Sequence, residues 1–92
     1  MTAEFLAGRQ IVIEALEASS LPALESSDIR YVLSYPDEDL AFAKLDADSL
    51  ALMEICIFLE LRTGIAFSLG DLDAHPTVNS LAEHLRFRLA GG

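Results

Sequence analysis

The chain has 92 residues, of which 15 are Asp or Glu and 6 are Lys or Arg, so its formal net charge is −9. Phosphates repel such an acidic surface, which argues against nucleic acids and anionic membranes as partners. The charge favours protein partners with basic patches, because opposite charge speeds their encounter. The length predicts one small domain over residues 1–92, and no uncharged apolar run is long enough to span a membrane.

The cysteine and histidine content bears on compartment and metal binding. A single cysteine, Cys56, excludes an intramolecular disulfide and leaves no second thiol for a metal site. We expect it to be a small buried side chain rather than a reactive thiol. His75 and His84 have no cysteine or histidine at ligand spacing, so no metal site is predicted. The first residues are acidic rather than basic, which is untypical of a secretory signal, and a cytoplasmic location is expected.

The first predicted helix covers residues 3–19. Thr2 is a suitable N-cap, and apolar residues recur at helical spacing at Phe5, Val12 and Leu16. The Ser-Ser-Leu-Pro sequence at residues 19–22 ends this helix.

Residues 21–47 have no regular hydrophobic pattern and are rich in the turn formers Ser, Pro and Asp. Ile29–Leu33 has the composition of a short strand, but a lone strand without a partner is implausible in this chain. We therefore predict a long ordered loop with a helical turn near residues 37–43. Three apolar side chains are expected to pin this loop to the core: Leu40, Phe42 and Leu45.

Two further main helices and a short one are predicted in the second half of the chain. The second main helix covers residues 49–63, with Asp48 as its N-cap and Gly64 just after its end. A short helix is expected near residues 68–73. The last helix follows Pro76-Thr77, with apolar residues at helical spacing: Val78, Leu81, Ala82, Leu85 and Leu89. The predicted fold class is therefore all-α, a small bundle of three main helices and a short one, with a long loop between the first two main helices.

The second main helix has more apolar residues than one buried stripe can hold. By their spacing, four of them are core candidates: Leu52, Ile55, Phe58 and Leu59. Leu50, Met53 and Ile57 share another face, which leaves two interpretations open. They are further core residues, or they form an apolar docking face for partner proteins, to which a flexible methionine is suited.

Ser49 is a candidate functional residue because it begins this helix. Unpaired backbone N–H groups and the positive end of the helix dipole gather at a helix N-terminus, which suits a phosphate ester. Serine is also common at this position for capping alone. Its surroundings do not fit a hydrolase nucleophile, because no Gly-x-Ser-x-Gly turn is present and both histidines are distant in the sequence.

Three segments resemble the acyl carrier protein family, in the same order and at similar separations. Leu45–Leu50 resembles the family's Leu-Gly-x-Asp-Ser-Leu attachment turn, Leu59–Ile65 resembles the end of its second helix, and Thr77–Leu85 resembles its last helix. Asp46 replaces the usual glycine, so a slightly different turn backbone is expected. Leu61 stands where fatty-acid carriers often have Glu. The resemblance covers most of the chain.

The resemblance implies an acyl carrier protein, which is not an enzyme. Ser49 would carry 4′-phosphopantetheine, transferred from coenzyme A by a Mg²⁺-dependent phosphopantetheinyl transferase, and the arm would hold acyl or aminoacyl groups as thioesters. The other implied partners are loading ligases and downstream transferases or synthases with basic docking patches. Asp48 would both cap the helix and be read by the transferase. The implied docking residues are Asp48, Leu50, Met53, Glu54, Ile57 and Glu60.

The distribution of charge bears on the pathway. Residues 25–48 contain seven acids and two bases, whereas residues 48–63 contain three acids and one arginine. The weakly acidic second helix is untypical of a fatty-acid carrier, so we expect a specialised biosynthetic pathway. The Asp-Ser-Leu sequence favours acyl or polyketide cargo over the cargo of peptide synthetases. The alternative is a helical protein-interaction module without a prosthetic group, and modification of Ser49 discriminates between the two.

Overall fold

The computed structural model describes residues 2–91 of the chain. These residues contain seven helical segments joined by short loops. Five are α-helices: α1 (Ala3–Ala18), α2 (Ser27–Ser34), α3 (Ser49–Thr63), α4 (Leu69–Ala74) and α5 (Val78–Leu89). Two are 3₁₀ turns: η1 (Pro22–Glu25) and η2 (Phe42–Leu45). The predicted all-α class is confirmed, and none of these described helices is long and apolar enough to cross a membrane.

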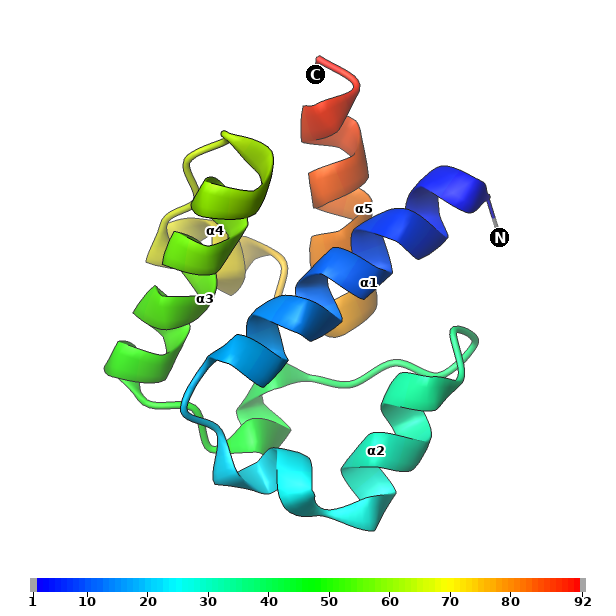
Figure 1. Cartoon of the computed structure of the whole chain (residues 1–92), viewed down its shortest axis with the longest axis vertical. Helices are drawn as coiled ribbons and strands as arrows, with labels where there is room; N and C mark the ends of the chain where they lie inside the picture. The colour runs from blue at the N-terminus through cyan, green and yellow to red at the C-terminus, as the bar shows by residue number, and fades with distance from the viewer. Residues whose placement is uncertain (1, 92) are drawn as a thin grey trace.

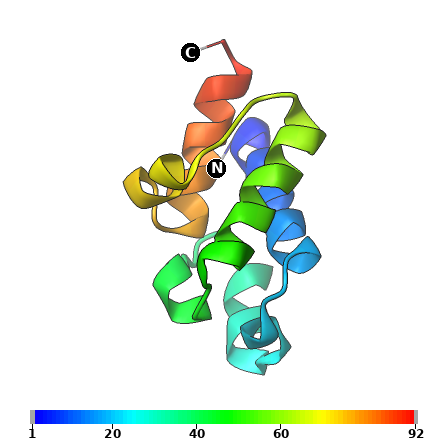
Figure 2. The same cartoon turned by 90° about the vertical axis from the view of Figure 1, so that its left-hand side faces the viewer.

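The core lies where α1 crosses α3 and α5. α1 packs against both of these helices, and α4 packs against α3 (Figure 1 and Figure 2). Each of the three long helices contributes side chains without solvent exposure: Val12 and Leu16, Ile55 and Leu59, and Leu81 and Leu85. Burying a side chain of this size contributes about 1.5–3 kcal/mol to folding. The contacts of α1 with α3 and α5 therefore form the centre of the core, and the shorter segments pack around it.

α1 and α5 approach closely at Gly8. A Cβ atom at this position would lie 3.0 Å from the backbone oxygen of Ala82. Any larger residue would push the two helices apart, so Gly8 fixes their separation.

The predicted N-caps of α1 and α3 and the predicted end of α3 are confirmed, and α1 ends at Ala18, one residue before the predicted end. The Thr2 side chain accepts a hydrogen bond from the backbone N–H of Phe5 (3.1 Å), and Asp48 caps α3 in the same way. Gly64 follows α3 with a φ of 76°, a conformation that glycine adopts without strain. α4 and α5 each begin with a capping box, in which two side chains three residues apart each accept a hydrogen bond from the other's backbone N–H.

The predicted long loop between the first two main helices is wrong over residues 27–34, which form α2. Ile29–Leu33, the segment with the composition of a strand, lies within this helix. The helical turn is η2 at Phe42–Leu45 rather than at residues 37–43. An isolated helix of eight residues is marginal in water, so α2 depends on contacts from outside the segment.

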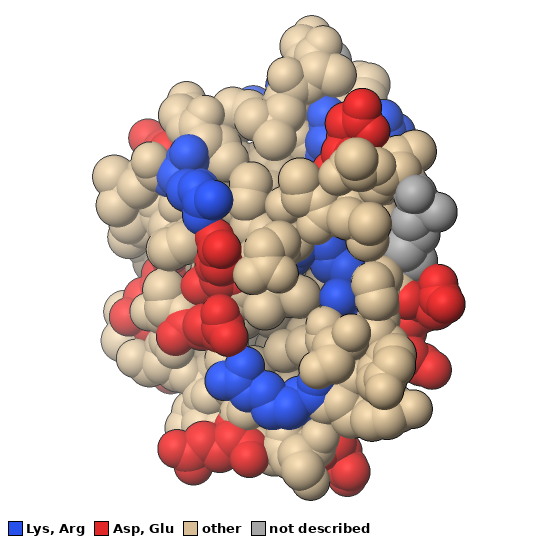
Figure 3. Space-filling view, turned by 45° about the vertical axis from the view of Figure 1, so that its right-hand side comes forward, with Lys and Arg blue, Asp and Glu red and all other residues tan. Residues whose placement is uncertain are grey.

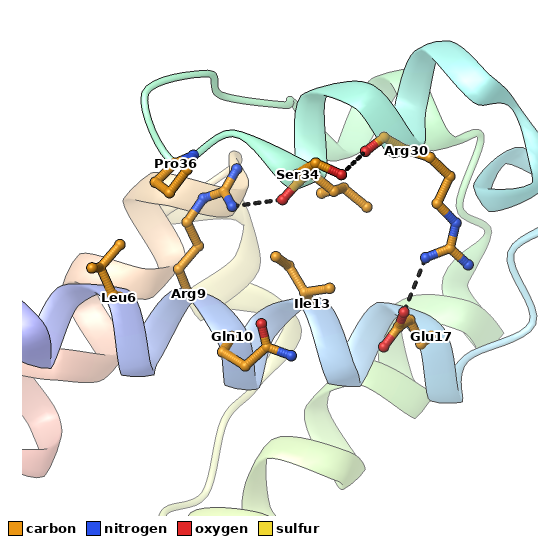
Figure 4. Close-up of a pocket in the computed structure, with 9 residues that line it drawn as sticks. Leu6, Arg9, Gln10, Ile13, Glu17, Arg30, Ser34 and Pro36 are labelled. Atoms are coloured by element: carbon orange, nitrogen blue, oxygen red, sulfur yellow. Dashed lines mark hydrogen bonds and ion pairs between the residues drawn. The ribbon is translucent and has the colours of Figure 1, made fainter.

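Arg9 of α1 provides such a contact. Its side chain is 3% exposed, and its guanidinium donates hydrogen bonds to the carbonyl oxygens of Val32, Leu33, Tyr35 and Glu38 and to Oδ1 of Asn79. Carbonyl groups at a helix C-terminus have no partner within the helix and carry partial negative charge. One arginine thus caps α2 from another helix, and Figure 4 shows its bond to the end of α2.

A side-chain network continues from Arg9 to the start of α5. The Asp39 carboxylate accepts hydrogen bonds from the Thr77 hydroxyl (2.8 Å) and from the backbone N–H of Asn79 (2.9 Å). Burial lowers the pKa of the Arg9 guanidinium, and the nearby Asp39 charge opposes this effect. Asn79 therefore contacts both Arg9 and Asp39, and links α1, the segment after α2 and α5.

Backbone hydrogen bonds also join the loop at residues 35–42 to the start of α5. The N–H of Phe42 donates to the Pro76 carbonyl, and the N–H of Val78 donates to the Leu40 carbonyl, both at 2.9 Å. The predicted burial of three loop side chains is confirmed for Leu40, Phe42 and Leu45. Residues 35–42 are therefore fixed from both sides.

Candidate functional site

The turn before α3 contains a residue in the left-handed conformation. Asp46 has a φ of 50° and a ψ of 36°, which L residues adopt at a cost of about 1–2 kcal/mol, with Asp and Asn the most tolerant. This is a region that glycine enters freely. The turn thus uses a backbone conformation suited to glycine although Asp46 occupies the position.

Asp48 and Ser49 form the start of α3. The Asp48 carboxylate accepts a hydrogen bond from the backbone N–H of Ala51 (2.8 Å), so its predicted role as N-cap is confirmed. Ser49 is the first residue of the helix and is exposed to solvent. Leu45, four residues earlier, is 1% exposed and anchors the turn in the core. The serine is therefore accessible on a turn whose base is buried.

The position of Ser49 fits a phosphate ester. Backbone N–H groups of the first helical turn have no partner within the helix, and the helix dipole stabilises an anion there by about 0.3–1 kcal/mol. The next residue, Leu50, is 66% exposed. The turn therefore offers an exposed hydroxyl, a helix N-terminus that favours an anion, and adjoining apolar surface at Leu50.

One face of α3 exposes large apolar side chains along its length. Leu50, Met53 and Ile57, whose burial the sequence left open, are 66%, 50% and 55% exposed. Leu61 is 82% exposed and extends the row by one turn. It is absent from the predicted docking set, although its spacing of four residues from Ile57 places it on this face. We call these four residues the α3 stripe.

The opposite face of α3 is buried. Ile55 and Leu59 are fully buried as predicted, and the other two core candidates, Leu52 and Phe58, are partly buried against the core. Cys56 is 7% exposed, and burial raises the pKa of its thiol. Cys56 is thus the small buried side chain that the sequence predicts, and α3 divides into a core face and a solvent face.

The charged side chains of α3 differ in how they are engaged. Glu54 accepts a hydrogen bond from the backbone N–H of Ser20 (3.2 Å), and Arg62 forms an ion pair with Glu14 of α1. Glu60 is exposed. Glu54 and Arg62 thus have partners within the protein, whereas the exposed Glu60 lies beside the α3 stripe.

Two hollows adjoin α3. The smaller, of about 180 Å³, is lined by residues that include Met53, Cys56, Ile57 and Leu69. The larger, of about 400 Å³, has a lining that includes Ala47, Leu52, Leu69 and Leu72. It lies beside residues 45–48, which we call the attachment turn after the family motif that they resemble. Leu69 of α4 belongs to both walls, so the position of α4 determines the shape of both hollows.

A further hollow, of about 500 Å³, lies between α1 and α2. Its lining includes Arg9, Arg30 and Glu17, and Arg30 forms an ion pair with Glu17 at 2.9 Å (Figure 4). Basic and acidic side chains are close together rather than in separate patches in the view of Figure 3. No residue of the attachment turn or of α3 lines this hollow, so it is not part of the candidate site.

Known proteins with similar sequences establish the family. Residues 28–85, more than half of the chain, match the family model described as "phosphopantetheine attachment site". The chain is 43% identical over 51 residues to erythronolide synthase EryA2 of Saccharopolyspora erythraea, a match that covers 55% of this chain and 1% of that synthase. No solved structure gives a significant match. The chain therefore belongs to the phosphopantetheine-attachment family of acyl carriers.

Family membership decides between the interpretations that the sequence left open. The predicted acyl carrier role is confirmed, as are the prosthetic group, 4′-phosphopantetheine, and the classification as a non-catalytic carrier. A helical interaction module without a prosthetic group does not agree with this match. The chain spans about 1% of the length of the synthase that it resembles. The activity of the whole synthase is therefore not assigned to this chain.

Proposed function

We propose that Ser49 bears the 4′-phosphopantetheine and that this chain delivers acyl groups to the enzymes of a specialised, polyketide-type pathway. The observation that carries the proposal is an exposed serine at the start of α3, directly after the N-cap Asp48 and within the residues that match the family. The thiol of the arm supplies the point at which an acyl group is held as a thioester. The α3 N-terminus would hold the phosphate end, with Leu50 beside it.

Mass spectrometry tests the attachment residue. The full chain, incubated with coenzyme A, Mg²⁺ and a phosphopantetheinyl transferase of broad specificity, should gain the mass of one arm, and Ser49→Ala should abolish the gain. Ser27→Ala is the matched control, because Ser27 is also exposed and is also the first residue of an α-helix. A gain that survives Ser49→Ala, or an equal loss in both variants, contradicts the assignment.

The α3 stripe is proposed as the docking surface for partner enzymes, together with Asp48, Glu54 and Glu60. Its side chains are 50–82% exposed, and contiguous exposed apolar surface commonly marks an interaction site. The stripe begins at Leu50, next to the proposed attachment residue, so a partner bound there also lies next to the arm.

Loading kinetics test this surface. Ile57→Glu should slow the loading of the modified chain by an acyl-transferring partner roughly tenfold or more, because a charge would be buried at the contact. Phe87→Glu is the control, since Phe87 is 57% exposed on α5 and outside the stripe. Equal effects of the two substitutions, or no effect of Ile57→Glu, contradict the docking role.

The pathway proposal is supported by the weakly acidic α3 and by the similarity to a segment of erythronolide synthase. Partners with basic patches are proposed because residues 25–48 carry seven acids against two bases. Loading the modified chain with a panel of ligases and transacylases tests the cargo, and efficient loading by general fatty-acid enzymes would contradict a specialised role. Added salt should slow loading if the acidic segment attracts the partner.

A further inference from the structure

A cluster of aromatic and ionisable side chains joins α4 to α5. The His75 ring, just after α4, stacks on the His84 ring of α5 with centroids 4.0 Å apart and planes at 13°. Phe67 meets the His84 ring edge-on at 6.1 Å, and the Arg88 guanidinium lies 5.7 Å from the centroid of the Phe67 ring. Oδ1 of Asp71 in α4 is 3.7 Å from Nε2 of His84. His84 is thus at the centre of the junction.

The surroundings of His84 favour its uncharged form. Its Nε2 atom is buried and has no hydrogen-bond partner among residues 2–91, because 3.7 Å from Asp71 is too long for a hydrogen bond. Oδ2 of Asp71 already accepts from the backbone N–H and hydroxyl of Ser68 in the α4 capping box. A protonated ring would lie partly buried near His75 and Arg88, which disfavour its charge, and near Asp71, which favours it. The described side chains form no metal-binding group that would give the cluster another role.

The direction of the pH effect follows from these contacts. Burial and the neighbouring His75 lower the pKa of His84 from its ordinary value of 6.5, with Arg88 acting in the same direction and Asp71 opposing it. An open form with His84 in water therefore takes up a proton before the packed form does. The packed form keeps its full stability above pH 6.5 and loses stability as the pH falls below it.

Two other titratable groups at the junction keep their charge states over this range. The pKa of Asp71 is lowered, chiefly by the backbone hydrogen bond from Ser68, so this carboxylate stays ionised. The pKa of the Cys56 thiol is raised by burial and by the Asp71 charge, so the thiol stays protonated. The change of charge that concerns the junction is therefore that of His84.

Apart from its capping box and its packing against α3, α4 has few contacts that hold it in place. It has six residues, and of its two leucines Leu72 is 4% exposed and Leu69 is 42% exposed. A short helix with one large buried side chain opens locally at low cost. Since Leu69 belongs to the walls of both hollows beside α3, a movement of α4 opens both.

We propose that the stacked pair His75 and His84 is a pH-sensitive latch: in mild acid, protonated His84 leaves its partly buried position, α4 detaches from α5, and the hollows beside the α3 stripe open. The latch is a property of the chain itself and does not depend on which residue bears the prosthetic group.

The thiol of Cys56 reports on this opening, because it is the one cysteine of the chain and lines the smaller hollow. The experiment measures the rate at which the Cys56 thiol reacts with a disulfide reagent that is active in mild acid. The rate is measured for the wild-type chain and for His84→Phe, between about pH 7.5 and about pH 5.5. Phenylalanine keeps a ring for the stack and cannot bind a proton. The ratio of the two rates cancels the pH dependence of the thiol. It should rise by up to about tenfold per pH unit below 6.5; a constant ratio overturns the latch.

NMR of the wild-type chain gives a second readout that needs no variant to fold. The His84 ring signals should titrate with a midpoint below 6.5, and amide exchange in α4, corrected for its intrinsic pH dependence, should accelerate over the same range while that in α1 does not. In His75→Phe the midpoint should move up toward 6.5, because a neighbouring titratable ring is removed. A wild-type midpoint at or above 6.5, or the same corrected pH dependence in α4 and α1, overturns the proposal.

Discussion

The two ends of the segment between α2 and α3 differ in how many interactions hold them in place. At its start, residues 35–42 are fixed by Arg9, by Asp39 and by two backbone hydrogen bonds to the beginning of α5. At its end, the attachment turn is anchored by the buried side chain of Leu45, has Asp46 in a left-handed conformation, and leads into α3, whose first turn is capped by Asp48. Ser49 thus follows a turn held chiefly by one buried side chain, whereas residues 35–42 are held by a network of hydrogen bonds. The residues that stabilise the fold are therefore separate from the surface that an enzyme must reach.

The largest effect on stability is expected at the fixed end, at Arg9. Arg9→Ala leaves one buried and three partly buried carbonyl groups without their donor, and we expect the free energy of unfolding to fall by about 3–5 kcal/mol. Arg30→Ala is the control, because Arg30 is half-exposed and pairs with a half-exposed Glu17, so its loss should be about 1 kcal/mol or less. Urea unfolding measures both. Equal losses would remove the distinction between the two ends of the segment.

A smaller effect is expected at Asp48. Asp48→Ala should lower stability by about 1 kcal/mol, because it removes the N-cap of α3, whereas Asp48→Asn caps nearly as well and should be close to neutral. Asp48→Asn also removes the charge. If the transferase reads this charge, the variant should be modified more slowly although it is as stable as the wild type. Thermal unfolding and the rate of mass gain give the two answers separately, and modification at the wild-type rate would leave Asp48 a cap only.

Substitution of Asp46 tests what stabilises the turn before α3. Asp46→Gly relieves the positive φ but adds freedom to the unfolded chain, so we expect a gain in stability of at most about 1 kcal/mol. Asp46→Ala keeps the unfavourable φ without a polar side chain to offset it, and should cost about 1 kcal/mol. Thermal unfolding distinguishes the two. A loss in both variants would show that the carboxylate, and not the backbone conformation, is what matters at this turn.

The smallest change in stability is expected on the α3 stripe. Ile57→Glu should alter the free energy of unfolding by less than about 0.5 kcal/mol, because Ile57 is 55% exposed. Ile55→Ala, on the buried face of the same helix, should cost about 2–5 kcal/mol. Thermal unfolding of the pair compares the two faces directly. A large loss for Ile57→Glu would place the stripe in the core and withdraw its proposed docking role.

The features that could be predicted from the sequence are those with local causes. The bounds of α3 follow from Asp48 and Gly64, whose capping roles need only their immediate neighbours. The hydrophobic spacing of α1 and α5 likewise indicates helices whatever they pack against. Ser49 is placed at the start of a helix by the same local pattern, and its candidate role as the attachment residue comes from the resemblance of Leu45–Leu50 to the attachment turn of acyl carrier proteins.

The features that were missed have distant causes. α2 contains β-branched and aromatic residues between turn formers, and its C-terminal carbonyls are satisfied by Arg9, which is 23 to 26 residues away in the sequence. No local pattern shows such a cap. The stack of His75 on His84 likewise requires that α4 and α5 meet, and the exposure of the α3 stripe requires knowledge of which face α1 covers. These are properties of the assembled fold.

The bridge between Ala41 and Thr77 also sets an order of events during translation. The loop at residues 35–42 uses the carbonyl of Pro76, which the ribosome adds 27 residues after Ser49. The two hydrogen bonds that join residues 35–42 to Pro76 and Val78 therefore form only after synthesis has passed the start of α5. Until then Ser49 lacks the folded loop that precedes it, so this part of the fold is completed late.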